Sequence, residues 1–426
     1  MKENNNTPEI RFDSFTDDWE QRKLGEFGQT YSGLSGKTKE DFGHGNAKFI
    51  PYLNIFNNPI TDLNFLDKIE IDKNQHMVRY GDILFTTSSE TPEEVGMSSV
   101  WLGKQGNIYL NSFCFGFTPT YKLDEFFIAY LMRSPNFRKN VILLAQGISR
   151  YNISKNKMMM TKLYYPAYKE QILIGRYFKS LDNLITLHQR ELEKNIHIKD
   201  TMLEKMFPID DTSKPEIRFN PFTDDWNSIE FGKIFSKIGK NSFSRDLLNY
   251  QIGDVKNIHY GDILIKFGFH IDVDDKVVPY INKEVNLSNY SKDDYLQSGD
   301  VIFADTAEDT TAGKMVEIIN DNNMKVLSGL HTYACRPTIE FEFGFLGIAL
   351  NSPNFHDQLL PYMQGTKVTG FNYDSLTKTI VKFPCLEEQK MITNYFKELD
   401  VLINNEENAI NKLKEIKKTL LEKMFV

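Results

Sequence analysis

The feature that most constrains this chain is a long segment that occurs twice. The segment from Pro166 to Phe207 aligns without a gap with the segment from Pro384 to Phe425, and nearly half of the aligned positions are identical. Both copies end in Leu-Glu-Lys-Met-Phe. Internal repeats are considered first, because each copy of a repeat is one structural unit and a missed repeat misassigns the whole architecture. The chain therefore consists of two half-chains of similar construction.

Each copy has the apolar pattern of a long helix. Neither proline nor glycine occurs from Phe178 to Phe207 or from Phe396 to Phe425. Apolar residues recur there at steps of three and four, which is typical of a coiled-coil seam. At 1.5 Å per residue, each helix would be roughly 43 Å long. The predicted seam residues are Phe178, Leu181, Ile185 and Leu192 in the first copy and Phe396, Leu399, Ile403, Ile410 and Leu413 in the second.

Polar residues interrupt both seams, at His188, Asn195 and Lys199 in the first copy and at Glu406 and Lys417 in the second. Such interruptions lower the stability of a helix pair but fix its register and its partner. Two equal helices in one chain predict an intramolecular antiparallel pair. The alternatives are that each helix packs only on its own domain or dimerises with another chain.

Further motifs are repeated outside these helices. The segment Pro8–Trp19 closely matches Pro215–Trp226, and we call these two segments the opening motifs. Two shorter landmarks, Gly-Asp-Ile/Val-Leu/Ile-Phe and Ser-Pro-Asn-Phe, also occur once in each half. Between the landmarks the halves diverge, and short β-branched and aromatic runs predict strands. The clearest predicted strands are Lys48–Leu53, Asp82–Thr87 and Asp300–Ala304.

The predicted fold class is α+β, with two mixed α/β domains separated by two long antiparallel coiled-coil helices in an internal pseudo-twofold repeat. A length of 426 residues agrees with more than one domain. The predicted divisions are a first domain over residues 1–165, a first helix over 166–207, a polar linker over 208–214, a second domain over 215–383 and a second helix over 384–426.

Composition limits the possible functions. A net charge of −8 argues against a nucleic-acid footprint over the whole protein, so any such contact must come from local basic loops. The three cysteines lie far apart and fit buried thiols in a reducing cytoplasm better than disulfides or a zinc site. No apolar run approaches the ~20 residues of a membrane span, and no signal-peptide pattern is present. We therefore expect a cytoplasmic protein that makes no membrane contact.

Three motifs that resemble catalytic sites fail on their spacing or context. Gly33–Thr38 lacks the four residues that a phosphate loop has between its glycines. Asn220-Pro-Phe lacks the second proline of an amino-methyltransferase motif. The acidic residues around Asp305 and Asp309, with Lys314, suggest a nuclease centre, but the matching segment of the first half keeps only one carboxylate. We therefore predict neither a catalytic residue nor a metal site.

The polar segments that follow the landmarks are better candidates for a functional surface. Arginine and lysine suit guanine edges and phosphates, asparagine suits adenine, and serine or threonine can bond to either. The candidate DNA contacts are Thr86, Thr87, Ser88, Ser89, Ser149, Arg150, Tyr151, Asn152, Ser154 and Lys155 in the first half and Asp305, Thr306, Glu308, Thr366, Lys367, Thr369, Asn372 and Tyr373 in the second.

Taken in order, the opening motif, the two landmarks, Pro-x-x-x-Glu-Gln at the start of the long helix and Leu-Glu-Lys-Met-Phe at its end resemble the specificity subunit of type I restriction–modification enzymes. The resemblance covers essentially the whole chain. None of these motifs is specific alone, but their duplicated order is typical of this family.

The resemblance implies a non-catalytic subunit whose two target-recognition domains each read one half of a bipartite, asymmetric site in double-stranded DNA. The paired helices would set the spacer and dock two modification subunits, which bind S-adenosylmethionine and methylate adenine. Restriction subunits, with ATP and Mg, would add translocation and cleavage, and this chain would bind no cofactor itself. The residues alone leave two alternatives, a two-domain protein adaptor that does not bind DNA and a stand-alone nuclease.

Overall fold

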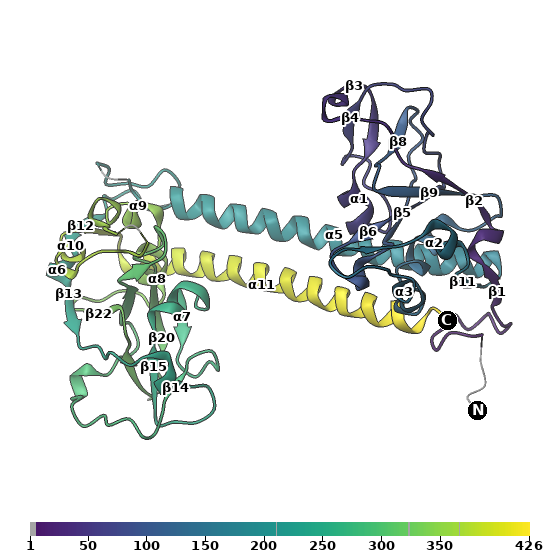
Figure 1. Ribbon diagram of the computed structural model, residues 1–426. Coiled ribbons are helices and arrows are strands. Elements are labelled where there is room, and N and C mark those ends of the chain that lie inside the picture. The colour runs from purple at the N-terminus through teal and green to yellow at the C-terminus, as the bar shows by residue number, and fades with distance from the viewer. Residues whose placement is uncertain (1–5, 210, 323, 366) are drawn as a thin grey trace. The chain divides into compact units, whose positions relative to one another are not determined.

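The structure is a computed structural model that describes residues 6–209, 211–322, 324–365 and 367–426 (Figure 1). The candidate residue Thr366 lies outside the described residues. The chain forms two compact units, Met1–Arg190 with Glu407–Val426 and Glu191–Glu406. Each unit therefore contains one globular region and a segment of each long helix.

The two long helices are α5 (Tyr168–Lys205) and α11 (Leu386–Lys423), teal and yellow in Figure 1. Each has 38 residues and lies within its predicted range, 166–207 for the first helix and 384–426 for the second. The first turns of α5 include Gly175, where an added Cβ would lie 2.5 Å from the Asp124 carboxylate and from the Phe127 nitrogen. Glycine is used here because the helix passes very close to its neighbour, and it does not end the helix.

Within each unit the two helix segments run antiparallel, as predicted. In the first unit Phe178 stacks on Phe425 at 5.5 Å between ring centroids, and further along, Asp182 pairs with Lys417 at 2.5 Å. In the second unit Lys199 pairs with Asp400 at 2.5 Å. The two lysines that interrupt the predicted seams are thus paired with acids at repeat-equivalent positions. All nine predicted seam residues are buried or half-buried.

The first globular region contains a four-stranded antiparallel sheet of order β2-β9-β5-β7, a three-stranded sheet of order β4-β3-β8 and the strand pairs β1-β11 and β6-β10. The strands are β1 (Glu20–Lys23), β2 (Gly28–Ser32), β3 (Phe42–Ile50), β4 (Asp67–Ile69), β5 (Ile83–Thr86), β6 (Ser88–Ser89), β7 (Ser98–Val100), β8 (Ile108–Leu110), β9 (Cys114–Pro119), β10 (Tyr151–Asn152) and β11 (Lys162–Tyr165). The short helices are α1 (Tyr52–Asn57), α2 (Glu125–Leu131), α3 (Pro135–Ile142) and α4 (Lys155–Met159). The predicted strand Lys48–Leu53 is too long, because Pro51 is the N-cap of α1.

The second globular region repeats this plan with one more strand in each sheet. Its sheets have the orders β13-β22-β18-β20-β16 and β14-β17-β15-β21, and its strand pairs are β12-β24 and β19-β23. The strands are β12 (Asn227–Glu230), β13 (Phe235–Ile238), β14 (Leu248–Asn249), β15 (Val255–Ile258), β16 (His270–Asp272), β17 (Tyr280–Ile281), β18 (Val301–Ala304), β19 (Thr306–Ala307), β20 (Met315–Asn320), β21 (Lys325–Ser328), β22 (Thr332–Pro337), β23 (Thr369–Gly370) and β24 (Ile380–Phe383). The helices are α6 (Phe231–Ile234), α7 (Tyr260–Ile265), α8 (Phe345–Ala349), α9 (Pro353–His356) and α10 (Tyr373–Thr377).

The Gly-Asp landmark forms a turn that starts a central strand in each region. The carboxylate of Asp82 accepts the Arg79 backbone N–H at 2.9 Å, and that of Asp300 accepts the Gln297 N–H at 2.8 Å. The glycine before each aspartate has a positive φ, 84° in the first region and 90° in the second. The landmark is therefore conformational, since the positive φ favours glycine and the buried acid closes the turn.

The Ser-Pro-Asn-Phe landmark joins each globular region to the end of a long helix. Its serine caps a short helix, as Ser134 does for α3. Its asparagine donates to the last residue of the Leu-Glu-Lys-Met-Phe motif, from Asn136 to the Phe425 carbonyl at 2.7 Å and from Asn354 to the Phe207 carbonyl at 2.5 Å. The first region therefore holds the end of α11, and the second region holds the end of α5.

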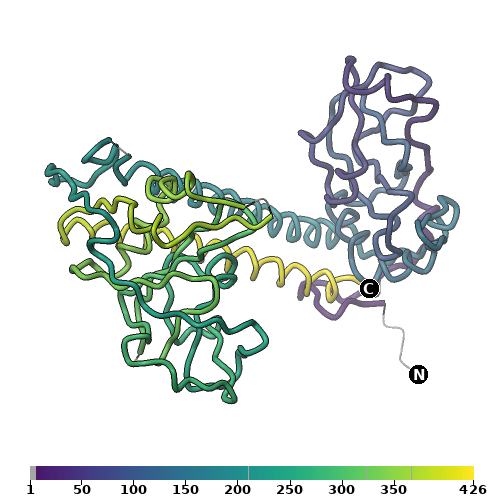
Figure 2. Tube along the Cα trace, turned by 60° about the vertical axis from the view of Figure 1, so that its left-hand side comes forward, coloured from purple at the N-terminus to yellow at the C-terminus, as the bar shows by residue number. Residues whose placement is uncertain are grey.

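The opening motifs lie against the same helix ends. The backbone N–H of Ile10 donates to the Lys423 carbonyl at 2.9 Å, and that of Ile217 donates to the Lys205 carbonyl at 3.0 Å. The C-terminus and the segment that follows residue 6 are accordingly close together in both views of the chain (Figures 1 and 2). Each opening motif thus fastens a helix end to the globular region of its unit.

Each unit has a hydrophobic core that includes both helix segments. The core of the first unit contains Trp19 from the opening motif, Phe178 from α5 and Phe425, which follows α11. Cys114 and Cys335 are buried as expected, and burial raises the pKa of the Cys335 thiol to about 12. Cys385, expected to be buried, is exposed just before α11. In the part of the chain that is described, every helix is too short or too polar to cross a bilayer.

A buried carboxylate makes the stability of the second unit depend on pH. Glu317 on β20 accepts the N–H groups of Gly344 and Gly347 at 2.8 and 2.6 Å, and burial raises its pKa to about 7. The folded state therefore holds a proton that the unfolded state releases near pH 4.5. Stability should fall as the pH rises from about 4.5 to 7, by up to about 3 kcal/mol.

Hydrogen exchange measured against pH on peptides from β20 tests this prediction. Glu317→Gln should remove most of the slope of protection between pH 5 and 8. The equivalent strand of the first unit, β7, carries Val100 at this position and serves as the internal control. An unchanged slope in the variant would contradict the assignment.

Candidate nucleic-acid interface

The candidate segments of each half form a short two-stranded ladder. Ser88 and Ser89 of β6 pair antiparallel with Asn152 and Tyr151 of β10. In the second region β19 pairs in the same way with β23. We call residues 86–90 and 146–155 the first loop pair, and residues 304–308 and 364–373 the second loop pair. The sequence predicted both segments of each pair as candidates, and the structure brings them together.

Identical backbone bonds build the two loop pairs. Gln146 and Asn152 exchange two N–H···O bonds of 2.9 and 2.8 Å, and Gln364 and Gly370 exchange two of 2.9 and 3.0 Å. A further bond ties each turn to the partner segment, from the Ile153 N–H to the Thr87 carbonyl at 2.9 Å in the first pair. The same backbone bonds therefore close both turns, and the sequences between them differ.

A glycine fixes the shape of each turn. Gly147 has φ of 137°, and an added Cβ would lie 2.0 Å from the Arg150 carbonyl oxygen. Gly147→Ala should therefore strain the turn by about 1–3 kcal/mol. Faster amide exchange at Gln146 and Asn152 would report the opening. Gly106→Ala is the control, because nothing lies within 4 Å of a Cβ there. Equal exchange in both variants would contradict this account of the turn.

The candidate residues of the first loop pair differ in exposure. Thr86 is fully buried and cannot contact a duplex in this conformation, which corrects the prediction for that side chain. Ser88 and Ser89 are also largely buried. Lys155 is held by a hydrogen bond of 2.8 Å to the Ser32 hydroxyl. Thr87 and Tyr151 are half-buried, and the freely exposed candidates are Ser149, Arg150, Asn152 and Ser154.

In the second loop pair several candidates already have intramolecular partners. The Asp305 carboxylate accepts from Lys240 at 3.1 Å and faces His331 at 3.2 Å. The Asn372 side chain caps α10 by accepting the Ser375 N–H at 2.9 Å. Thr306, Thr369 and Tyr373 are half-buried, and Glu308 and Lys367 are exposed. The ammonium of Lys237 lies 4.4 Å from the Tyr373 ring centroid.

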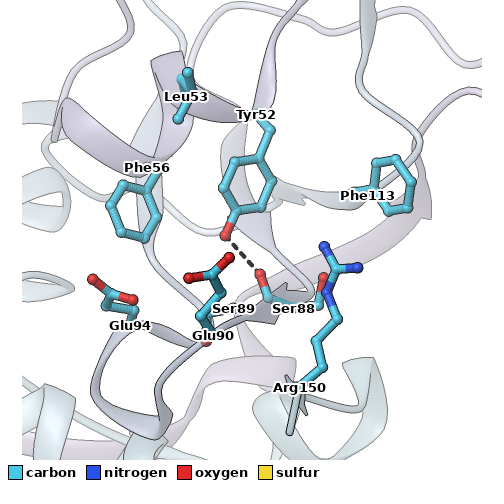
Figure 3. Close-up of a pocket in the computed structure, with 9 residues that line it drawn as sticks. All are labelled: Tyr52, Leu53, Phe56, Ser88, Ser89, Glu90, Glu94, Phe113 and Arg150. Carbon is cyan, nitrogen blue, oxygen red and sulfur yellow. Dashed lines mark hydrogen bonds between the residues drawn. The ribbon is translucent and has the colours of Figure 1, made fainter.

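A pocket of about 270 Å³ opens beside the first loop pair (Figure 3). Tyr52, Phe56 and Phe113 form aromatic walls, and the Tyr52 hydroxyl donates to the Ser88 carbonyl at 2.6 Å. Burial raises the pKa of Tyr52, so this hydroxyl stays protonated. The rest of the lining is polar or charged. The complete lining is Tyr52, Leu53, Phe56, Ser88, Ser89, Glu90, Glu94, Phe113 and Arg150.

The aromatic walls and Glu90 were missed in the sequence, although one signal was present. Glu90 aligns with Glu308, the single carboxylate that the two segments share. The second loop pair borders an open pocket of about 420 Å³, which includes Asp305, Tyr333 and Val368 in its lining. Each globular region therefore has a hollow at its loop pair, with different chemistry in the two regions.

The suspected nuclease cluster does not assemble. The Lys314 ammonium donates to two backbone carbonyls, those of Leu264 and Phe267, at 3.0 and 3.1 Å. The Asp309 carboxylate accepts from Thr311 two residues further on, which closes a local turn. Among the residues that the structure describes, no group of three histidine, cysteine, aspartate or glutamate side chains is placed to hold a metal ion.

Comparison with known proteins agrees with this arrangement. The model of the family "Type I restriction modification DNA specificity domain" matches residues 16–196 and 225–415. A putative type I restriction enzyme MjaX specificity subunit from Methanocaldococcus jannaschii is 23% identical over 229 residues, which are 51% of this chain and 52% of that protein. This chain thus spans about half the length of that curated relative.

Two solved structures share the fold across almost their full length. The type I restriction–modification S subunit from M. genitalium aligns over 99% of both chains with a TM-score of 0.55 and 14% identity. A chain from a structural study of assembly and conformational transition of the type I R-M system aligns over 96% of this chain and 97% of its own, with a TM-score of 0.57 and 15% identity. The fold class predicted from the repeat is therefore confirmed.

The family model matches twice, once in each half. Each match begins inside an opening motif and extends into a long helix. The two matches together cover most of the chain. This protein accordingly belongs to the family of type I restriction modification DNA specificity domains.

Proposed function

We propose that this chain gives a type I restriction–modification complex its DNA sequence specificity. Each globular region would read one block of a bipartite site in double-stranded DNA, and α5 and α11 would hold the two regions and dock two modification subunits. The chain itself would perform no catalysis. S-adenosylmethionine, ATP and Mg would be bound by the modification and restriction subunits.

The observation that carries this proposal is the pair of equivalent turns with different tips. The backbone bonds of Gln146 with Asn152 recur in Gln364 with Gly370, whereas the side chains between them differ almost throughout. A constant frame with variable exposed side chains suits the reading of two different base sequences. Contacts to base edges determine which sequence is bound, whereas contacts to the DNA backbone only orient the protein. The net charge of −8 agrees with a share of the phosphate contacts coming from the partner subunits.

Methylation mapping by single-molecule sequencing tests the proposal. DNA from cells that express this chain together with its modification subunit should carry methyladenine at one bipartite motif. Cells that express the modification subunit alone should lack it. A stable complex without any modified motif would contradict the proposal and would favour a protein adaptor, whose binding should not depend on added DNA.

A further inference from the structure

The most informative unassigned feature is a pair of opposite charges that do not meet. Glu90 and Arg150 line the same pocket of the first loop pair (Figure 3). Within the described part of the chain, neither the Glu90 carboxylate nor the Arg150 guanidinium forms a hydrogen bond or ion pair. Both groups are exposed. They are therefore available together for a ligand that offers hydrogen-bond donors and acceptors side by side.

The strand register explains why these two side chains share one face. Ser89 is opposite Tyr151 in the antiparallel ladder. Continued by one residue, this register places Glu90 opposite Arg150. Directly opposed residues of an antiparallel pair project their side chains to the same side. The second loop pair has the same register, with Ala307 opposite Thr369, which places Glu308 opposite Val368.

Both loop pairs thus carry a glutamate at the equivalent position, but the residue opposite the glutamate differs. Glu90 and Glu308 are equivalent, whereas the guanidinium of Arg150 is replaced by the isopropyl group of Val368. Val368 is 55% exposed at the turn and lines the pocket of the second loop pair. A carboxylate on a turn that faces DNA repels the phosphates and so weakens sequence-independent binding. It can favour binding only by accepting a hydrogen bond from a base.

We propose that Glu90 and Arg150 read one G·C base pair, and that Glu308 and Val368 read one A·T base pair in the other block. A guanidinium matches the O6 and N7 acceptors of guanine, and a carboxylate accepts the N4 amino group of cytosine in the same pair. At an A·T pair the carboxylate accepts the N6 amino group of adenine, and an apolar side chain contacts the thymine methyl group. This inference rests on the proposed function.

The surroundings of the first pair favour this assignment. The aromatic walls formed by Tyr52, Phe56 and Phe113 line the pocket that Glu90 and Arg150 share. When a base edge fills the pocket, these walls would displace water around it, and hydrogen bonds are stronger where the local dielectric is low. The backbone bonds around Gly147 hold the turn that carries Arg150, so the reading geometry does not have to form on binding.

The experiment begins with the modified motif of the complex that contains the unaltered chain. A bipartite motif upholds the proposed function, and its absence refutes that function separately from this inference. Arg150→Ala and Glu90→Gln are then mapped individually. Both should relax the same G·C position, lowering its discrimination roughly ten- to hundred-fold. Relaxation at different positions, at an A·T pair or at no position would overturn the assignment.

The exchange of the two tips provides the matched test. Val368→Arg should change one A·T position of the other block to G·C. Gly106→Ala, where nothing lies within 4 Å of an added Cβ, should change neither block. Binding to duplexes that each carry one modified base provides a second test, which does not require a variant with altered sequence specificity. Replacing guanine by 7-deazaguanine at the assigned position should weaken binding by the unaltered complex but not by the Arg150→Ala complex. Equal weakening of both complexes would overturn the guanine contact.

Discussion

Replacing Arg11 by alanine should unfold the first unit selectively. The Arg11 guanidinium donates Nε to Oε1 and Nη2 to Oε2 of Glu170 at 2.7 and 2.8 Å. The Glu170 side chain is fully buried, and that of Arg11 is 13% exposed. Removing one partner of a buried pair leaves an uncompensated charge, which costs about 3–5 kcal/mol. The measurement is urea-dependent hydrogen exchange on peptides from each unit.

The repeat supplies the controls for this prediction. Arg218 makes the equivalent pair with Glu388, also with two bonds of 2.7 Å, so Arg218→Ala should destabilise the second unit instead. Lys205 pairs with Glu216 on the surface at 2.6 Å, and Lys205→Ala should leave both units unchanged. If Arg11→Ala lowers the stability of the first unit no more than Lys205→Ala does, the buried pair does not fasten the opening motif.

Replacing Phe425 by alanine should destabilise the first globular region, although Phe425 lies at the far end of the sequence from it. Its ring packs 5.7 Å from Phe127 and 5.5 Å from Phe178, with Trp19 edge-on at 6.4 Å. Loss of a buried phenylalanine ring costs about 3–5 kcal/mol, as transfer and cavity terms add. The fluorescence of Trp19 during urea unfolding is the natural readout, in a variant where the other tryptophans are replaced by phenylalanine.

Phe207, two residues after the end of α5, is the matched position. It packs against Trp226 at 5.8 Å and Phe345 at 6.2 Å, so Phe207→Ala should destabilise the second unit to a similar extent. Leu187→Ala, at a residue that is 54% exposed on α5, should change stability by less than about 0.5 kcal/mol. If Phe425→Ala instead loosened the second globular region, the division of the helices between the units would be wrong.

The long helices and the repeated frame could be predicted because both leave a local signal. Phe178, Leu181 and their equivalents recur with helical period, and the packing that buries them follows directly from that period. The same reasoning could not find the partner of Glu170, because Arg11 lies on a distant opening motif and ion pairs leave no periodic trace. Lys199 and Lys417 were predicted to lower the stability of the helix pair and to fix its register. Each forms an ion pair with the other helix, a partner that the sequence pattern did not reveal.

The sequence identified the segments that form the candidate interface, but not which of their side chains are exposed. Repeat position identified the segments around Ser88 and Arg150, which the structure joins through β6 and β10. Burial of Thr86 depends on which face of β5 meets the core, and a short polar run does not reveal that. The aromatic walls come from α1 and from Phe113, segments distant in sequence whose approach is set by the tertiary fold.

If each globular region reads one block of the site, a copy of the first region grafted in place of the second should bring its own specificity with it. Residues Asn227–Phe383 are replaced by a second copy of Glu20–Tyr165, with junctions at the outer ends of the equivalent strand pairs β12-β24 and β1-β11. The grafted Asn136 would meet Phe207 in an identical Leu-Glu-Lys-Met-Phe motif, so the helix end should still be held.

The graft is expressed with the modification subunit, co-purification confirms assembly, and the methylated motif is mapped. The second block of the motif should disappear, and both blocks should carry the sequence read by the first region. An assembled complex that still modifies the original second block would contradict it.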